Sequence, residues 1–205
     1  MTAPRIVGAG RHGVLVEVSS TGEATALAAS LRASPLDGVE DVVGAQRTVL
    51  VRGSLPADAL RAVVAERLSS MPRTAAAAPA GMVVVPVDYD GDDLAEVAAR
   101  CGLGIDDVVA AHAGAVYTVA FCGFAPGFAY LTGLCAVLVL PRRATPRPRV
   151  PAGSVAVAGD LSAVYPTASP GGWHLLGRTD VTLFDPGRTP PALLAPGTTV
   201  RFEPR

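Results

Sequence analysis

The chain contains no lysine: all 17 residues in the Lys+Arg count of this 205-residue sequence are arginine. This excludes a Walker-type phosphate-binding loop, whose lysine neutralises the transferred phosphates, and a Schiff-base lysine for a carbonyl substrate or pyridoxal phosphate. It also excludes a lysine that carries biotin and a lysine base for a serine nucleophile. Arginine is therefore the only strong cation with which this chain can bind an anion.

The sequence also lacks an excess of charge of one sign and an even number of cysteines that could all pair. The formal net charge is −1, so no global positive field would attract nucleic acid or an anionic membrane. The three cysteines, Cys101, Cys122 and Cys135, are odd in number and form no C-x-x-C motif. The N-terminus lacks the apolar core of a signal peptide. We therefore expect reduced thiols in a cytoplasmic protein.

A long unbroken apolar run is also missing. Residues 108–141 contain no Asp, Glu, Lys or Arg, but His112, several glycines and Pro126 interrupt the stretch. A transmembrane helix needs roughly 20 consecutive apolar residues. The interruptions favour buried strands joined by tight turns, and we expect no membrane span.

The first part of the chain alternates strand and helix patterns. They fall at residues 14–18 (strand), 23–32 (helix), 39–43 and 48–51 (strands) and 57–68 (helix). This order is that of a split βαβ, ferredoxin-like unit, which needs a further strand for completion. We predict a small ferredoxin-like α/β domain over residues 1–80, with an Ala/Pro-rich linker at 71–81.

The second part, residues 82–205, changes to short strands with frequent Gly and Pro turns. After a strand at 82–87, Asp92–Asp93 and Asp106–Asp107 open two short helices, where carboxylates suit the helix dipole. Further strands are predicted at 116–121, 136–140, 154–158, 179–184 and 199–202. Such a pattern predicts a β-barrel or sandwich, so the whole chain is α+β.

His112 is a candidate catalytic residue, in the last turn of its helix just before Gly114. An imidazole titrates near neutral pH and could act as a general base. A histidine at a helix C-terminus is equally well explained by its favourable interaction with the helix dipole. The sequence leaves both interpretations open, and it shows no clustered metal ligands.

The densest run of arginines comprises Arg142, Arg143, Arg147 and Arg149. Arginine binds carboxylates and phosphates through two parallel hydrogen bonds. The alternative is a solvated loop or a patch for an acidic partner. We expect Arg142 and Arg147 to serve a site or a subunit interface. Arg178 could pair with Asp160 or Asp180, or could face an anion.

Aromatic residues flank two glycine-containing turns. Phe124, Phe128 and Tyr130 surround Pro126–Gly127, which predicts either a buried barrel turn or the aromatic wall of a substrate pocket. Trp173 and His174 follow a Ser-Pro-Gly-Gly turn, whose glycines permit close approach of another backbone. Trp173 could equally be a core residue, an interface anchor or a ligand contact.

Three segments carry a family resemblance. They read GF-x-PGF-x-YL from Gly123, RxxTPRxxVPAGSV from Arg142 and YPxxSPGGWxLLGRT from Tyr165. At these residues the chain resembles the family of allophanate hydrolase subunit 1, also known as the B subunit of 5-oxoprolinase, which includes an inhibitor of a sporulation histidine kinase. The match runs essentially end to end. The chain departs little from the sequence pattern of this family: Asp160 stands where a second glycine or small polar residue is common in the family, and His12 lies in a variable N-terminal turn.

The resemblance implies a small α/β domain followed by a cyclophilin-like β-barrel, without conferring prolyl isomerase activity. It also implies two partners in an ATP-dependent enzyme that opens 5-oxoproline to glutamate: the C subunit, which is similar to allophanate hydrolase subunit 2, and the A subunit. Ser154 lacks the flanking glycines of a G-x-S-x-G nucleophile turn, and no phosphate-binding loop is present. We therefore expect this chain to bind no cofactor itself, with ATP used by the complex.

Together these observations predict a non-autonomous subunit of a ring-opening amidohydrolase, which acts on a small-molecule amide and is inactive alone. The predicted site residues are His112 (catalytic), Arg142, Arg147, Phe128, Tyr130 and Arg178 (substrate-binding), and Trp173 and His174 (interface). Two alternatives stay open: a regulatory protein that inhibits a histidine kinase, and a subunit of an allophanate or urea amidolyase-type complex.

Overall fold

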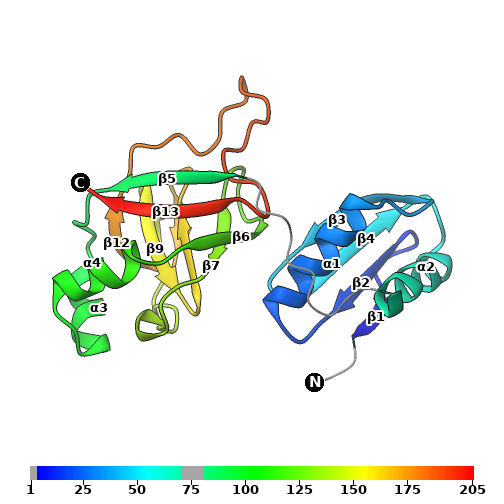
Figure 1. The fold of residues 1–205 in the computed structure, drawn as a ribbon, viewed down its shortest axis with the longest axis horizontal. Helices are drawn as coiled ribbons and strands as arrows, with labels where there is room; N and C mark the ends of the chain where they lie inside the picture. The colour runs from blue at the N-terminus through cyan, green and yellow to red at the C-terminus, as the bar shows by residue number, and fades with distance from the viewer. Residues whose placement is uncertain (1–3, 71–80) are drawn as a thin grey trace. The chain divides into compact units, whose positions relative to one another are not determined.

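The computed structural model describes residues 4–70 and 81–205. The chain divides into two compact units, Met1–Ala78 and Pro79–Arg205 (Figure 1). Apart from Gly81, the predicted linker at 71–81 lies outside the described residues. No helix within the two described ranges is long and apolar enough to cross a membrane.

The first unit is a four-stranded antiparallel sheet with two helices packed on one face. The strands are β1 (Arg5–Gly8), β2 (Gly13–Glu17), β3 (Val39–Gly44) and β4 (Thr48–Gly53), in the order β1-β2-β4-β3. The helices are α1 (Thr21–Ala33) and α2 (Ala57–Ser70). Leu27 of α1 and Leu60 of α2 join the same core as Val16 and Val49 of the sheet. Because strand side chains alternate in direction, these valines define the covered face.

The strand that completes this sheet comes from the N-terminus. β1 pairs antiparallel with β2, from Arg5 opposite Glu17 to Gly8 opposite Val14. It thus occupies the edge position that completes the ferredoxin-like pattern of strands and helices. The sequence does not reveal this strand, because four residues, Arg-Ile-Val-Gly, are too few to show a period.

The second unit is a nearly closed β-barrel. Its seven-stranded sheet has the order β12-β9-β10-β7-β6-β13-β5. The strands are β5 (Met82–Val87), β6 (Tyr117–Cys122), β7 (Ala129–Thr132), β9 (Ser154–Ala158), β10 (Leu161–Val164), β12 (His174–Arg178) and β13 (Thr199–Pro204). Asp88, directly after β5, exchanges two backbone hydrogen bonds of 2.9 Å with Arg178 at the end of β12, which joins the two edges. The predicted α+β class with a barrel domain is confirmed.

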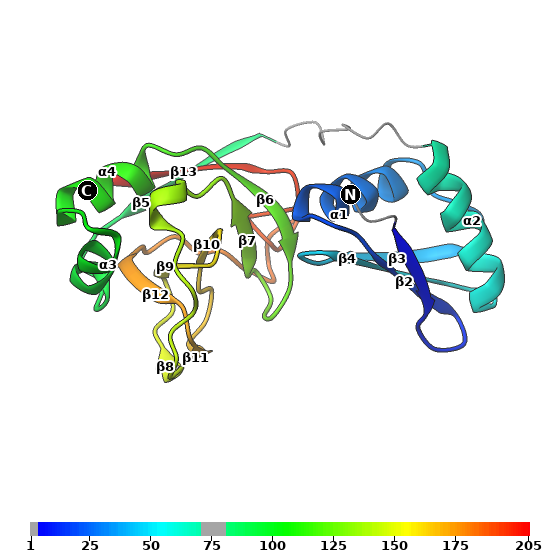
Figure 2. The same ribbon diagram turned by 90° about the horizontal axis from the view of Figure 1, so that it is seen from below.

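The barrel strands carry apolar side chains on both faces. On β9, Val155 joins the interior core with Tyr117 and Phe202, whereas Ala156 joins a second core on the outer face with Phe128. The two-stranded ribbon of β8 (Arg147–Val150) and β11 (Ser169–Gly171) stands out from the barrel beside β9 (Figure 2). Val150 of this ribbon belongs to the outer core. This part of the outer face is therefore covered by protein rather than by solvent.

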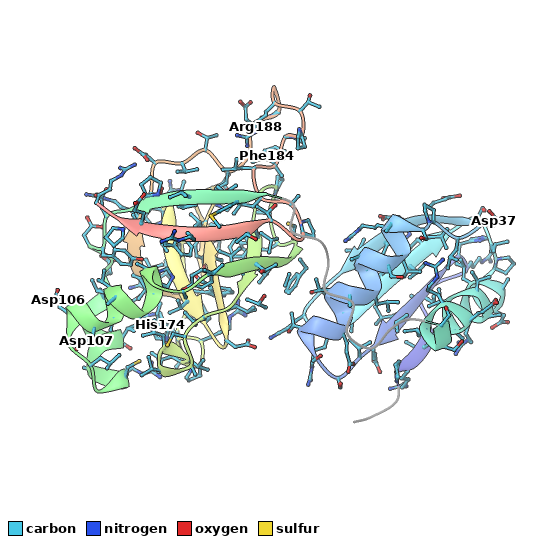
Figure 3. All side chains as sticks on the ribbon, viewed as in Figure 1. Asp37, Asp106, Asp107, His174, Phe184 and Arg188 are labelled. Atoms are coloured by element: carbon cyan, nitrogen blue, oxygen red, sulfur yellow. The ribbon has the colours of Figure 1, made fainter. Side chains whose placement is uncertain are left out.

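Two short helices, α3 (Leu94–Cys101) and α4 (Ile105–Ala113), pack against one end of the barrel. Asp106 and Asp107 stand in the first turn of α4, as predicted (Figure 3). The backbone N–H of Gly104 donates to Asp107 Oδ2 at 3.2 Å. This carboxylate therefore satisfies an N–H at the start of the helix.

Two predicted strands are wrong. Within 136–140 the chain forms a 3-10 turn, η1 (Ala136–Leu138), and an isolated bridge from Leu140 to Gly159, and 179–184 contains only an isolated bridge from Phe184 to Ala192. Both segments show the alternation of a strand, because Leu138 and Leu183 are buried between more exposed neighbours. Both segments bury a leucine against the barrel without pairing as a strand. A sequence pattern alone does not distinguish such a segment from a true strand.

Candidate functional site

Four aromatic rings form one cluster on the outer face of the barrel. The ring centroid of Phe128 lies 4.9 Å from that of Tyr130, 5.3 Å from that of Tyr165 and 5.9 Å from that of Trp173. Phe128, Tyr165 and Trp173 are buried, and Tyr130 on β7 is half-buried. We call these four residues the aromatic cluster. The structure thus brings together three residues predicted for the site, and Tyr165 is an addition.

Phe124 extends the aromatic cluster to the surface. Its ring centroid lies 5.2 Å from that of Phe128, and the residue is 63% exposed. Its φ of 71° and the 2.9 Å hydrogen bond from Ala125 N–H to Gly123 O define a γ-turn of the strained kind. A non-glycine residue in this region costs on the order of 1–3 kcal/mol, and such strain concentrates at binding sites.

Arg142 lies next to Trp173 of the aromatic cluster, because Pro141 on one side of it contacts His174 at 3.0 Å and Arg143 on the other side donates to Gly172 O at 2.8 Å. Burial raises the pKa of Tyr130 and of Tyr165, and in both cases the positive charge of Arg142 opposes that rise. Arg142 is exposed and forms no ion pair with any carboxylate in the described part of the chain. An exposed guanidinium beside aromatic faces can bind a ligand that combines a carboxylate with an apolar ring.

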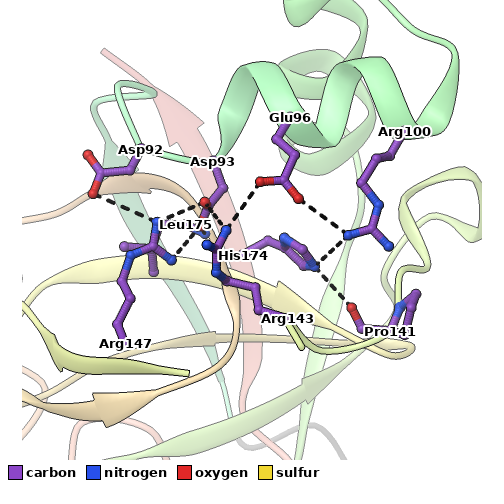
Figure 4. Close-up of polar contacts among 9 residues, drawn as sticks. All are labelled: Asp92, Asp93, Glu96, Arg100, Pro141, Arg143, Arg147, His174 and Leu175. Atoms are coloured by element: carbon purple, nitrogen blue, oxygen red, sulfur yellow. Dashed lines mark hydrogen bonds and ion pairs between the residues drawn. The ribbon is translucent and has the colours of Figure 1, made fainter. Parts of the chain in front are cut away.

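Arg147, the second arginine predicted to bind substrate, is held inside the molecule by Asp93. Its Nη1 donates to Asp93 Oδ2 at 2.9 Å and its Nη2 to Asp93 Oδ1 at 2.8 Å, a bidentate pair (Figure 4). Asp92 Oδ2 lies 3.9 Å from the same guanidinium. The geometry assigns Arg147 to the support of the site, because both arms of its fork are occupied by a carboxylate.

Arg143 reaches the same carboxylate. Its Nη1 donates to Asp93 Oδ1 at 2.6 Å and to Glu96 Oε2 at 3.2 Å (Figure 4). Burial alone would raise the pKa of Asp93, but the hydrogen bonds from Arg147 and Leu175 and the two arginine charges lower it. Asp93 therefore stays ionised while only 2% exposed. The two guanidinium groups tie residues 141–147, which we call the arginine loop, to the start of α3.

His174 and Trp173, the predicted interface residues, are both buried within this chain. His174 Nε2 lies 3.0 Å from the carbonyl oxygen of Pro141 and 3.5 Å from Arg100 Nη1 (Figure 4). Because a carbonyl only accepts, the shorter contact makes this nitrogen a donor. Its Nδ1 is buried with no hydrogen-bond partner among the described residues. His174 thus anchors the first residue of the arginine loop, and any partner would meet the residues that cover it.

His112 lies away from the aromatic cluster, fully buried between α4 and the barrel. Tyr89 Oη is 2.8 Å from Nδ1 and Ser162 Oγ is 3.0 Å from Nε2. Since the Ser162 hydroxyl donates to Ala156 O at 3.3 Å, Nε2 of His112 donates to Ser162 and Nδ1 accepts from Tyr89. Burial lowers its pKa from 6.5 to about 3, so the imidazole is neutral. A catalytic role for His112 stays a prediction.

Arg178 pairs with neither of the carboxylates expected from the sequence. Its Nη2 lies 2.9 Å from Asp90 Oδ2, and both side chains are largely exposed. Asp180 instead accepts from Arg205, across the closing edge of the barrel. Of the two alternatives for Arg178, the structure does not bear out the pairing with Asp160 or Asp180, because the loop after β5 brings Asp90 to its guanidinium; that Arg178 faces an anion stays a prediction.

Asp93 is the residue of this region that the sequence does not reveal. The pattern at Asp92 and Asp93 indicates only a helix start, and nothing in it distinguishes the buried carboxylate from the exposed one. Within residues 4–70 and 81–205, no group of three or more His, Cys, Asp or Glu side chains is placed to hold a metal ion.

Comparisons with known proteins agree on one family. The model of the carboxyltransferase domain, subdomain C and D, matches residues 4–194. The B subunit of the 5-oxoprolinase of Escherichia coli O157:H7 is 52% identical over 126 residues, which cover 60% of this chain and 58% of that protein. The chain thus spans less than two thirds of the curated relative that it matches.

Solved structures share the fold. The crystal structure of TTHA0988 in space group P6522 is 38% identical, with a TM-score of 0.79, over 95% of this chain and 40% of that chain. The urea carboxylase of Kluyveromyces lactis is 17% identical, with a TM-score of 0.73, over 98% of this chain and 22% of that chain. The likeness to urea carboxylase shows the fold alone. In both cases most of the longer chain lies outside the shared part.

Proposed function

The chain belongs to the family of the carboxyltransferase domain, subdomain C and D, and we propose that it is one subunit of an ATP-dependent 5-oxoprolinase. In this proposal it is incomplete alone and acts in the cytoplasm with the A and C subunits of that enzyme. The 52% identity to a protein named as the B subunit of 5-oxoprolinase supports the reaction. That name itself implies an enzyme of several subunits.

The observation that carries the proposal is the exposed Arg142, which lies next to Trp173 of the aromatic cluster because Pro141 contacts His174 and Arg143 donates to Gly172. The substrate, 5-oxoproline, is a five-membered lactam ring that carries one carboxylate. In the proposed complex, Arg142 binds that carboxylate, and Tyr130 and the exposed Phe124 line the ring, with the buried Phe128 packed behind both. Arg147 and Arg178, which are also predicted to bind substrate, act in this proposal through their carboxylate partners instead.

The remaining chemistry is assigned to the partner subunits. The sequence has no lysine to neutralise the phosphates of ATP, and His112 in the last turn of α4 is fully buried. Ring opening also needs water and a proton donor at the lactam. We therefore assign proton transfer and ATP binding to the A and C subunits, which would close over the exposed edge of the aromatic cluster.

The test is reconstitution. Co-expression with the neighbouring A and C subunits, followed by purification, should give a complex that forms glutamate from 5-oxoproline only when ATP is present, while this chain alone gives none. Arg142→Ala should lower kcat/KM about 10-fold to 100-fold, the range for loss of a charge-assisted hydrogen bond. The matched control is Arg149→Ala, an exposed arginine of the same run, which should keep the rate.

Two results would contradict the proposal. Glutamate formation by the isolated chain would show that it is complete, and a pure complex without turnover would disprove the reaction. Allophanate and urea belong in the same assay, because urea carboxylase shares this fold. Preference for either would favour the urea amidolyase-type alternative. Inhibition of a histidine kinase by the chain, in an autophosphorylation assay, would favour the regulatory alternative.

A further inference from the structure

We propose that Asp93 is a positioning residue of this site: it fixes the arginine loop so that Arg142 stands beside the aromatic cluster, next to Trp173, and binds a carboxylate ligand. The identity of the ligand rests on the proposed function. The role of Asp93 rests on geometry, and nothing in the family motifs points to it.

The carboxylate of Asp93 is fully satisfied by donors from two distant parts of the chain. Oδ1 accepts from Arg143 at 2.6 Å and from Arg147 at 2.8 Å, while Oδ2 accepts from Arg147 at 2.9 Å and from Leu175 N–H at 2.8 Å. A carboxylate offers about four lone-pair sites, so its capacity is filled. This arrangement joins the start of α3, the arginine loop and β12 at one buried point.

Asp93 occupies the N-cap position of α3 without capping that helix. Its side chain makes no hydrogen bond to the N–H groups of the first turn, although aspartate is among the best capping residues. The carboxylate is turned toward the two arginines instead. A local preference that is overridden by a tertiary contact marks a position where the tertiary contact is required.

The residues on either side of Arg142 are both immobilised. The carbonyl of Pro141 accepts from His174 at 3.0 Å, and the backbone N–H of Arg143 donates to Gly172 O at 2.8 Å. The guanidinium of Arg143 is bound to Asp93 and Glu96. Arg142 is thus held between two fixed points with its own charged group exposed. Fixing a loop before binding reduces the ordering cost that the ligand must offset.

The chemistry around Arg142 selects a class of ligand. Phe124 and the half-buried Tyr130 present aromatic surface, and the exposed Arg142 presents a fork of N–H donors that suits a carboxylate. The expected ligand is a small apolar ring that bears one carboxylate. A neutral amide of the same ring leaves the charge of Arg142 unmatched and should bind less well.

Trp173 provides a reporter for this binding. It is the only tryptophan of the chain, and its ring centroid lies 5.9 Å from that of Tyr130. Titration of 5-oxoproline and of its carboxamide into the full chain, alone and in complex with its partner subunits, is followed by Trp173 fluorescence and by calorimetry. We expect the carboxylate to bind the wild type at least about 10-fold more tightly than the amide.

The variants separate positioning from folding. Arg142→Ala should remove the preference for carboxylate over amide, and Asp93→Asn should reduce it about 10-fold. In the Arg142→Ala background, Asp93→Asn should then have no further effect on that preference, because it acts through Arg142. The control Asp180→Asn breaks an exposed ion pair with Arg205 and should keep the wild-type preference. Melting temperatures of all variants check that each is folded.

Each outcome decides the inference. An unchanged preference in folded Asp93→Asn, or an equal loss of affinity for carboxylate and amide, would make Asp93 merely structural and overturn the proposal. An unchanged preference in Arg142→Ala, or no preference for carboxylate in the wild-type complex, would overturn the ligand class. These binding results are separate from turnover. A complex that binds the carboxylate through Arg142 but forms no glutamate contradicts only the proposed function.

Discussion

Asp93 and His112 are both buried, yet Asp93 is charged and His112 is neutral, because their neighbours differ. Asp93 receives hydrogen bonds from two guanidinium groups and stays ionised, since these contacts outweigh the effect of burial on its pKa. His112 has only neutral neighbours, Tyr89 and Ser162, so burial lowers its pKa and keeps it uncharged. At the level of single residues, a charge is kept inside this molecule only where a counter-charge is supplied.

Arg142 and Arg147 of the arginine loop should therefore differ in how much their removal lowers the free energy of unfolding. Arg147→Ala leaves Asp93 buried with fewer donors and should lower the free energy of unfolding by about 2–3 kcal/mol. Arg142→Ala removes an exposed side chain and should change it by less than about 0.5 kcal/mol. Urea denaturation at pH 7 measures both. Equal destabilisation would show that Arg147 is not held by Asp93 in solution.

His112 should make stability depend on pH. Its pKa is 6.5 in the unfolded chain and about 3 in the folded one, so the unfolded state binds more protons between these values. The stabilising effect of neutral burial is complete above pH 6.5 and is lost as the pH falls towards 3. The free energy of unfolding should fall by up to about 1.4 kcal/mol per pH unit in this range.

The measurement is urea denaturation from about pH 7 to about pH 4.5 for the wild type and for His112→Gln, which cannot titrate. The difference in slope between the two proteins isolates His112 from the other groups that bind protons in acid. Parallel slopes would mean that His112 is accessible or charged in the folded state, and would reopen its predicted role as a base.

Among the elements, the start of α3 is brought against β12 by a glycine. A Cβ on Gly91 would lie 2.4 Å from Leu175 O and 2.5 Å from Gly177 N, both backbone atoms that cannot move independently. The close approach lets Asp93 N–H donate to Leu175 O at 3.1 Å and lets Leu175 N–H donate back to the carboxylate at 2.8 Å. The position of the carboxylate therefore depends on a residue without a side chain.

Gly91→Ala should consequently lower the free energy of unfolding by about 2–4 kcal/mol and weaken carboxylate binding. The matched control is Gly123→Ala, because a Cβ on Gly123 would meet nothing within 4 Å and its φ is not in the left-handed region. Thermal unfolding compares the two variants. A Gly91→Ala protein as stable as Gly123→Ala would show that α3 can move away from β12 without cost.

Helices and strands are predictable from the sequence where the spacing of apolar residues agrees with Gly and Pro residues at the ends of the segment. In the first unit, the helices α1 and α2 and the strands β2, β3 and β4 follow clear runs between Gly and Pro, and the structure places helices and strands there. Residues 136–140 are a short apolar run and residues 179–184 alternate between polar and apolar, as strands do, yet neither segment forms a strand. In both segments, apolar side chains pack against the barrel. A local sequence pattern cannot show whether a neighbouring strand is available for pairing.

Across the whole chain, the two units have separate cores. Among the residues that the structure describes, the core of the first unit draws on residues between Ile6 and Leu68, and the cores of the second unit draw on residues between Val83 and Phe202. Independent cores indicate independent folding. The two-domain division at residue 80 therefore stays a prediction that can be tested directly.

A fragment of residues 81–205 should fold by itself. Trp173 belongs to this fragment, so its fluorescence reports the barrel alone. The fragment should unfold cooperatively with a melting temperature within a few degrees of the Trp173 transition in the full chain. A fragment without a cooperative transition would show that the barrel needs the first unit.

Three properties follow from the order of the amino acids alone: arginine is the only strong cation, the chain is α+β, and its motifs belong to one family. The same order selects Phe128, Tyr130 and Trp173, whose rings form one cluster in the structure. The packing of the elements adds that Asp93 binds Arg143 and Arg147, across sequence separations of 50 and 54 residues, and leaves Arg142 exposed. No sequence pattern could show this, because a period describes one element. A buried carboxylate is satisfied by donors from several elements, and only folding brings those donors within hydrogen-bond distance.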